Sequence, residues 1–140
     1  MKIKELDKYS KRMLHYVTKQ LKIKVRYNKK PIKDAEGGYH IGGNTIYLNR
    51  DKIPDNETFQ HVLAHECGHA LDTTLDEDTF VYHRDRRKEH VESHDWIIDS
   101  EVRAWRSASK IFKMFDLKLN KDRVNKWIGT YGGKYEEENN

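Results

Sequence analysis

The chain has 140 residues, a length that predicts one domain covering residues 1–140. Only 36% of the residues are hydrophobic and 36% are charged, so we expect a compact core under a heavily charged surface. The single cysteine, Cys67, excludes an intrachain disulfide and fits a reducing compartment. No apolar run approaches the roughly 20 residues that span a bilayer, and the first residues lack the apolar core of a signal peptide. We therefore expect a cytoplasmic, monomeric protein that does not enter a membrane.

The net charge of +4 is unevenly distributed along the chain. Residues 1–33 carry twelve Lys or Arg against Glu5 and Asp7. Such a basic region could bind nucleic acid or an acidic protein partner. We favour a simpler interpretation, in which the lysines cover a solvated helix face and then a sheet edge, where they discourage pairing with other chains.

The first part of the chain predicts one helix followed by a small sheet. Apolar residues at helical spacing predict a helix over about residues 3–20. Alternating apolar and polar side chains predict a half-buried strand over 23–28, and residues 39–49 are typical of a hairpin. We interpret residues 36–38, Glu-Gly-Gly, as a turn. A sheet of about three strands is therefore expected.

The stretch His65-Glu66-Cys67-Gly68-His69 contains the pattern His-Glu-x-x-His. On a helix, positions i and i+4 share one face, so both imidazoles can reach a single ion. Glu66 points about 100° around the helix from His65, which places its carboxylate beside the metal. A carboxylate there can take a proton from a metal-bound water. The pattern predicts the active-site helix of a zinc peptidase.

We expect this helix to run from about residue 56 to residue 71 or 72, with Asp55 as its N-cap. Its apolar residues share one side and should face the core, whereas the histidines should face a cleft, so the helix is predicted to be amphipathic. We interpret Gly68 as leaving room between the two histidines, and Cys67 as a small core residue.

The second half of the chain predicts a loop and two further helices. Residues 73–88 lack a clear period, which predicts a long loop beside the cleft. A helix is expected over about 90–115, and Glu101 lies in the middle of its apolar stripe, where a carboxylate is costly unless it is paired or bound to metal. A short final helix should begin after Asn120, and residues 134–140 should form a frayed tail.

These elements together predict an α+β fold. A small antiparallel or mixed sheet would pack with the active-site helix, the glutamate-bearing helix and the N- and C-terminal helices.

A catalytic zinc ion takes three protein ligands and keeps one position for water. His65 and His69 supply two ligands, and we predict Glu101 as the third, for one Zn²⁺ per chain. Asp72 could instead hold the outer nitrogen of His69. Several side chains remain alternatives for the third ligand, namely Asp72, His83, His90 and His94.

The predicted chemistry assigns Glu66 as the group that takes the water proton and passes it to the leaving amine. The oxyanion needs a further donor, for which we predict His94 as a catalytic residue, with Tyr82 and His83 as alternatives. The edge of the small sheet could pair with an extended substrate.

Two stretches, His65 to Asp72 and Glu101 to Trp105, resemble the gluzincin pattern, in which a glutamate on a later helix completes the zinc site. The strand at 45–49 ahead of the first stretch resembles the ImmA/IrrE-type metallopeptidases of bacteria, phages and mobile elements. The first stretch is also similar to anthrax-lethal-factor-like peptidases, in which a tyrosine donor precedes the glutamate. Here His94 lies in that region. The resemblance implies a minimal zincin-like domain and a metallopeptidase that acts on a regulatory protein such as a repressor.

The expected function is therefore that of a zinc-dependent endopeptidase acting on a peptide or protein substrate. The alternative is a catalytically silent zinc-fold protein that regulates or binds nucleic acid through its basic N-terminal region.

Overall fold

The computed structural model describes residues 1–28 and 35–132, so the tail predicted at 134–140 lies outside the described residues. The fold is α+β, as predicted, with five α-helices and a three-stranded mixed sheet in the described part of the chain. The elements, in chain order, are the short helix η1 (Ile3–Glu5), α1 (Lys8–His15), η2 (Tyr16–Gln20), β1 (Lys24–Asn28), β2 (Gly37–His40), β3 (Thr45–Asn49), η3 (Arg50–Lys52), α2 (Asn56–Ala70), α3 (Glu77–Arg86), α4 (Val91–Met114) and α5 (Lys121–Gly129). Across residues 1–28 and 35–132, no helix combines the length and the apolar character needed to span a bilayer.

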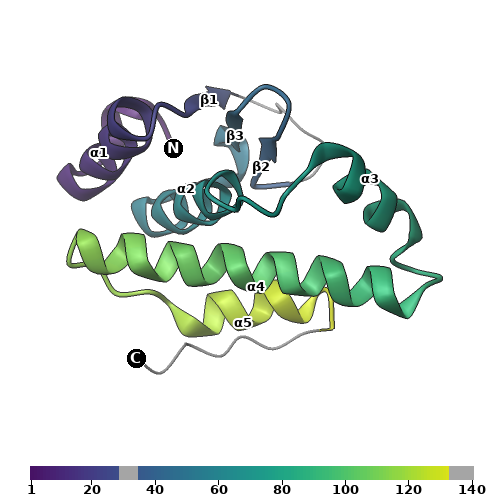
Figure 1. Cartoon of the computed structure of the whole chain (residues 1–140). Helices are drawn as coiled ribbons and strands as arrows, with labels where there is room; N and C mark the ends of the chain where they lie inside the picture. Colours follow the sequence, from purple (N-terminus) through teal and green to yellow (C-terminus); the bar gives the residue numbers. More distant parts are fainter. Residues whose placement is uncertain (29–34, 133–140) are drawn as a thin grey trace.

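Helix α2 lies in the middle of the molecule, between the sheet on one side and α4 on the other (Figure 1). Asp55 caps it, as predicted, by accepting a hydrogen bond from the backbone N–H of Thr58 at 2.8 Å. Every side chain from Thr58 to His69 is buried. The prediction of an amphipathic helix is therefore wrong, because its polar side is buried as well as its apolar side. The predicted cleft side is nevertheless present, since His65 and His69 line a cavity.

The close approach of α2 and α4 depends on Gly68. A Cβ atom at this position would lie 2.2 Å from the backbone oxygen of Ala104 on α4. Our interpretation of Gly68 as a spacer between the two histidines is therefore wrong. The glycine instead lets the backbones of two helices touch at the level of the histidines, which brings α4 within reach of them.

The sheet has the strand order β1-β3-β2, with β1 parallel and β2 antiparallel to β3. The predicted hairpin of β2 and β3 is confirmed, but the predicted turn at 36–38 is wrong, since Gly37 and Gly38 belong to β2. A Cβ atom on Gly37 would lie 2.5 Å from Cγ1 of Val62 on α2. Glycine is needed in β2 because α2 packs directly on this strand.

Helix α3 occupies the stretch for which we predicted a loop, so that prediction is wrong. Asp76 caps α3 by accepting a hydrogen bond from the backbone N–H of Thr79 at 3.0 Å. The helix has no buried residue, so it leaves no apolar period in the sequence. It rests on α4, where the ring of His83 stacks on Trp96 with 4.5 Å between the ring centroids.

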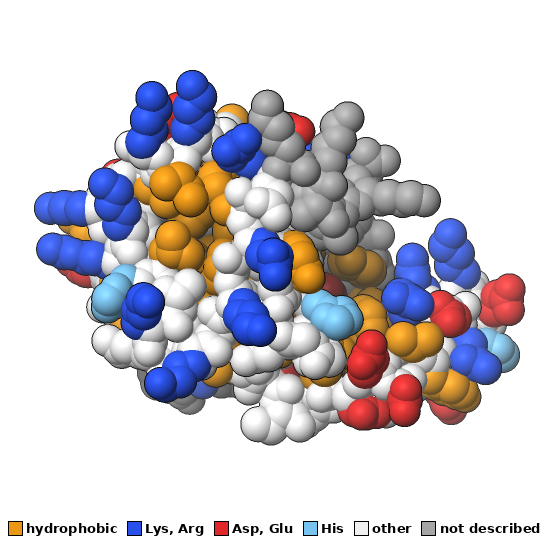
Figure 2. Space-filling model, turned by 90° about the horizontal axis from the view of Figure 1, so that it is seen from above, with side chains coloured by type: hydrophobic (Ala, Val, Ile, Leu, Met, Phe, Trp, Pro, Cys, Tyr) orange, Lys and Arg blue, Asp and Glu red, His pale blue; other side chains and the backbone are white. Residues whose placement is uncertain are grey.

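The predicted helix over 3–20 is divided into η1, α1 and η2. Asp7 starts α1 by accepting a hydrogen bond from the backbone N–H of Ser10 at 2.8 Å. The basic strand β1 is an edge strand, in agreement with our interpretation of its charges. Seen from above, lysine and arginine side chains surround apolar side chains on the face that carries α1 and β1 (Figure 2).

Candidate metal centre

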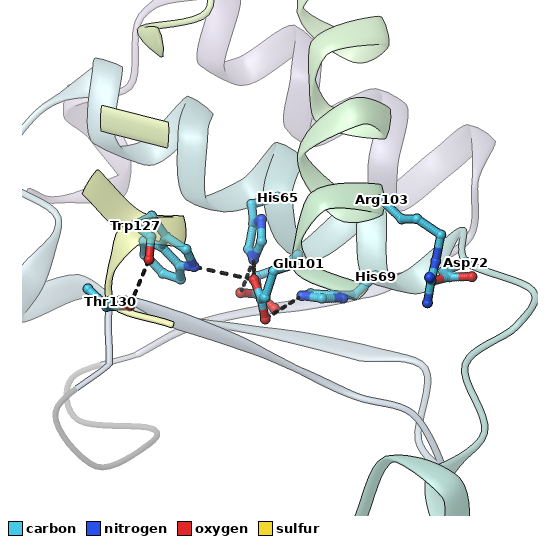
Figure 3. A network of polar contacts seen from close by, with 8 residues as sticks. His65, His69, Asp72, Glu101, Arg103, Trp127 and Thr130 are labelled. Carbon is cyan, nitrogen blue, oxygen red and sulfur yellow. Dashed lines mark hydrogen bonds and ion pairs between the residues drawn. The ribbon is translucent and has the colours of Figure 1, made fainter. Parts of the chain in front are cut away.

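Helices α2 and α4 bring three ligand side chains together. Nε2 of His65 lies 2.9 Å from Oε2 of Glu101, and Nε2 of His69 lies 3.3 Å from Oε1 of the same carboxylate (Figure 3). The histidines are on successive turns of α2, and α4 presents Glu101 where Gly68 permits close packing. All three residues are buried. The three predicted ligands therefore lie together in the structure.

The residues of this cluster fit a metal ion. Their ligand atoms all lie within 4.8 Å of one another. Around a tetrahedral zinc ion with bonds of about 2.0–2.1 Å, ligand atoms are separated by about 3.3 Å. Two imidazole nitrogens and a carboxylate oxygen form a donor set that zinc and other first-row transition metals accept. The cluster could thus hold a metal ion with small adjustments of the three side chains.

The electrostatics of the cluster are those of a buried carboxylate between two imidazoles. Burial by itself would raise the pKa of Glu101, but His65 and His69 outweigh burial and hold that pKa well below its usual range. Burial would likewise lower the pKa of His69, but the negative charge of Glu101 outweighs it and the pKa of His69 is raised. A proton on the His69 imidazole therefore helps to balance the carboxylate, and a divalent cation could take over this role.

Glu66 lies beside the cluster, with Oε1 at 3.9 Å from Nε2 of His65. Its side chain is only 5% exposed. Burial raises the pKa of Glu66 above its ordinary value, although His65 and His69 oppose this effect. The carboxyl group is therefore placed where the sequence pattern predicts it, next to the ligands and with an increased affinity for a proton.

Two tryptophans surround His65. Its ring centroid lies 4.4 Å from that of Trp105 on α4 and 5.1 Å from that of Trp127 on α5. Among the described residues, Nδ1 of His65 has no hydrogen-bond partner. Aromatic packing, rather than a hydrogen bond to the outer nitrogen, therefore fixes the orientation of this imidazole.

Asp72 does not join the cluster or hold His69. Its Oδ2 accepts a hydrogen bond from Nε of Arg103 at 2.9 Å, and its Oδ1 accepts bonds from the backbone and side chain of Thr74 (Figure 3). The side chains of His83 and His90 are also separate from the three ligands. Nδ1 of His83 lies 2.9 Å from the hydroxyl of Ser93, and His90 is an exposed N-cap of α4.

The ligands open onto a cavity of about 260 Å³. Strand β2 and the segment after it form one wall, α5 and Tyr131 form another, and α3 contributes Phe80. The described residues that line the cavity are Ala35, Gly37, Gly38, Tyr39, Ile41, His65, Glu66, His69, Leu75, Phe80, Glu101, Trp127 and Tyr131. The candidate metal site is therefore accessible to a small group, and its surroundings are mainly apolar.

His94 is not among the described residues that line this cavity. Its Nε2 donates a hydrogen bond to the backbone oxygen of Tyr131 at 2.8 Å, and its Nδ1 lies 3.3 Å from the carboxylate of Asp95. The predicted role of His94 as an oxyanion donor gains no support from this position. Instead, His94 holds the segment that carries Tyr131, which does line the cavity.

Our sequence analysis missed Trp127 and Tyr131 as residues of the site. Burial, and after it the negative charge of Glu101, raises the pKa of Tyr131 to about 12, so its phenol keeps its proton. Neither residue belongs to a sequence motif. They reach the site only because α5 folds back along α4. The sequence predicts that Trp127 belongs to the final helix, but not which residues its side chain contacts.

Comparisons with known proteins do not add to this picture: no family model, no curated protein and no solved structure matches the chain.

Proposed function

We propose that the protein is a zinc-dependent peptidase of gluzincin type, with His65, His69 and Glu101 as the metal ligands. One observation supports this most directly. Three buried ligand side chains and a fourth polar side chain, the carboxyl group of Glu66, meet at one cavity next to an edge strand. When bound, a zinc ion would supply Lewis-acid chemistry that polarises a scissile carbonyl and acidifies water.

Glu66 is the general base in this proposal. It takes a proton from the attacking water and later delivers that proton to the leaving amine. Burial raises the affinity of its carboxyl group for a proton. A base that must also act as an acid benefits from a pKa closer to neutrality than that of an exposed glutamate.

Tyr131 is the donor to the developing oxyanion in this proposal, in place of His94. Tyr131 lines the cavity together with Glu66 and the ligands, and its phenol stays protonated because its pKa is raised to about 12. His94 contributes by binding the backbone oxygen of Tyr131, which keeps the segment in position. A protonated hydroxyl that is already in place stabilises a new negative charge without reorganisation of solvent.

An extended peptide is the substrate that the cavity walls favour. Strand β2 is an outer strand of the sheet that the described residues form, so its outer edge can pair with a peptide main chain. The side chains of Ile41, Leu75 and Phe80 offer an apolar surface for a substrate side chain. A flexible segment of a regulatory protein, such as a repressor of a phage or mobile element, belongs to this substrate class.

The substitution Glu66→Gln tests the proposal. The zinc-loaded wild-type protein should cleave members of a mixture of unstructured peptides, detected by mass spectrometry. Glu66→Gln should bind zinc as the wild type does but lose cleavage by at least about 100-fold, the upper range for a general base. Cleavage that persists in the variant at the wild-type rate would overturn the role of Glu66, and a wild type without zinc would overturn the proposal.

A nucleic-acid-binding function is the alternative that the basic side chains of α1 and β1 favour. Lys8, Lys11, Arg12, Lys24 and Arg26 are all exposed. Salt-dependent binding of duplex DNA that Glu66→Gln leaves unchanged, in a protein that cleaves no peptide, would support this function over proteolysis.

A further inference from the structure

The indole N–H of Trp127 donates a hydrogen bond to Oε2 of Glu101 at 3.3 Å. The indole comes from α5, whereas the carboxylate is on α4 (Figure 3). The Glu101 side chain is 10% exposed, so few water molecules can reach it. This bond is therefore a direct link between the last helix and a candidate metal ligand.

The N-cap residue of α5 is hydrogen-bonded to the first two turns of α2, and this fixes the position of Trp127. The backbone N–H of Asn120 donates to Nε2 of His61 at 2.9 Å, and the side-chain amide of Asn120 donates to Oε1 of Glu57 at 2.7 Å. Val124 and Ile128 anchor the same helix in the core, since both are fully buried. Trp127 therefore projects from a rigid element, which is a requirement for a precise contact.

The bond from Trp127 differs from the two other contacts of the carboxylate. His65 and His69 can donate to Glu101 only through the nitrogens that a metal ion would occupy. An indole N–H is a donor that does not bind metal ions in proteins. The bond from Trp127 can therefore persist when the imidazole protons have been replaced by a metal.

We propose that Trp127 is a positioning residue for the metal site, and that its indole N–H orients the carboxylate of Glu101 toward the ion. This inference rests on the metal site of the proposed function but not on its proteolytic activity. Outer hydrogen bonds to ligating carboxylates typically change metal affinity by about 10- to 100-fold. The described residues offer Nδ1 of His65 no acceptor, whereas Trp127 supplies an outer hydrogen bond to Glu101.

The substitution Trp127→Phe removes the indole N–H and keeps an aromatic ring beside His65. Zinc affinity, measured by competition with a chromophoric chelator, should fall by about tenfold. The absorption spectrum of the cobalt-loaded protein should shift, because the oxygen ligand is reoriented. Thermal unfolding of the metal-free protein in chelator reports whether the fold is intact. Trp96→Phe is the matched control, since Trp96 packs on His83 outside the site and should leave zinc affinity unchanged.

A double-mutant cycle with Glu101→Ala separates positioning from packing. If Trp127 acts through the carboxylate, Trp127→Phe should cause no further loss of zinc affinity once Glu101 is gone. An equal loss in both backgrounds, or wild-type affinity and an unchanged cobalt spectrum in Trp127→Phe, would overturn the inference while leaving the proposed function standing. A wild-type protein that binds no zinc would overturn both.

The wild-type protein decides the question if Trp127→Phe does not fold. The indole ¹H–¹⁵N resonance of Trp127 should exchange slowly with solvent in both the metal-free and zinc-loaded protein. Rapid exchange after zinc is added would show that the hydrogen bond is absent in the loaded site and would overturn the inference.

Discussion

Nε2 of His61 on α2 accepts a hydrogen bond from the backbone N–H of Asn120, at the start of α5, with a distance of 2.9 Å. Nδ1 of the same ring lies 2.7 Å from the backbone oxygen of Glu57, which can only accept, so Nδ1 carries the proton. The ring is 1% exposed and neutral in this arrangement. A second proton would remove the acceptor on which the start of α5 depends.

The stability of the protein should therefore contain a pH-dependent contribution from His61. Burial is the main reason that the pKa of His61 is lowered from 6.5. The unfolded chain takes up this proton first, so the contribution of His61 is complete above pH 6.5 and is lost as the pH falls toward the folded-state pKa. The loss amounts to at most about 1.4 kcal/mol per pH unit.

Urea unfolding of the metal-free protein between pH 8 and pH 5 measures this contribution. The stability difference between the wild type and His61→Gln should shrink as the pH falls below 6.5, because the glutamine does not titrate. His15→Gln, which changes an exposed histidine on α1, should give a profile parallel to the wild type. A stability difference between wild type and His61→Gln that is the same at every pH would contradict the prediction.

The substitution Gly68→Ala should destabilise the protein by about 3 kcal/mol, the upper range for overpacking. The new Cβ atom would lie 2.2 Å from the backbone oxygen of Ala104, which cannot rotate away as a side chain could. Separation of α2 from α4 should also weaken zinc binding, since the ligands come from both helices. Chemical denaturation and chelator competition measure the two effects.

Gly129→Ala is the matched control for this substitution. Gly129 is the last residue of α5, and an added Cβ atom there meets no other atom within 4 Å. Because alanine favours helix by up to about 1 kcal/mol over glycine, this variant should be as stable as the wild type or more stable. Equal stability of the two variants would mean that α2 and α4 can separate without penalty.

The parts of the site that sequence predicts are those that local geometry determines. His65 and His69 share a face because they are four residues apart on one helix, and Glu101 stands out as a carboxylate in an apolar stripe. Trp127 and Tyr131 could not be placed, since their position depends on how α5 packs. Helix α3 has no buried side chain and so no periodic signal, although the pair Asp76 and Thr79 marks its start.

The ion pair of Asp72 and Arg103 should support the fold rather than metal binding. It joins the end of α2 to α4, and the Asp72 side chain is 7% exposed. Asp72→Asn should lower the free energy of unfolding by about 1 kcal/mol, because Arg103 is 37% exposed and water partly replaces its partner. Zinc affinity should change by less than about threefold, since outer-shell groups that act on a metal change it by 10-fold or more.

Arg103→Gln should cause a similar loss of stability, and the double variant should lose less than the sum of the two. Additive losses would show that the ion pair contributes nothing by itself. A tenfold loss of zinc affinity in Asp72→Asn would restore the alternative in which Asp72 acts on His69.

Zinc affinity should depend on the pH, through the protonation of His69, and on the presence of Glu101 as a ligand. Because the pKa of His69 in the metal-free protein is raised above 6.5, zinc must displace a proton from it, and affinity should begin to fall before the pH drops to 6.5. Glu101→Gln should reduce affinity at pH 8 on the order of 100-fold or more, since a ligand is lost. It also removes the charge that raises the pKa of His69, so the difference in zinc affinity between variant and wild type should narrow as the pH falls to 6.

Chelator competition between pH 6 and pH 8.5 measures both effects. Glu92→Gln, an exposed position on α4, is the control and should follow the wild-type curve. A loss in Glu101→Gln that is the same at every pH would mean that Glu101 does not set the protonation of His69, and no loss at pH 8 would remove Glu101 from the ligand set.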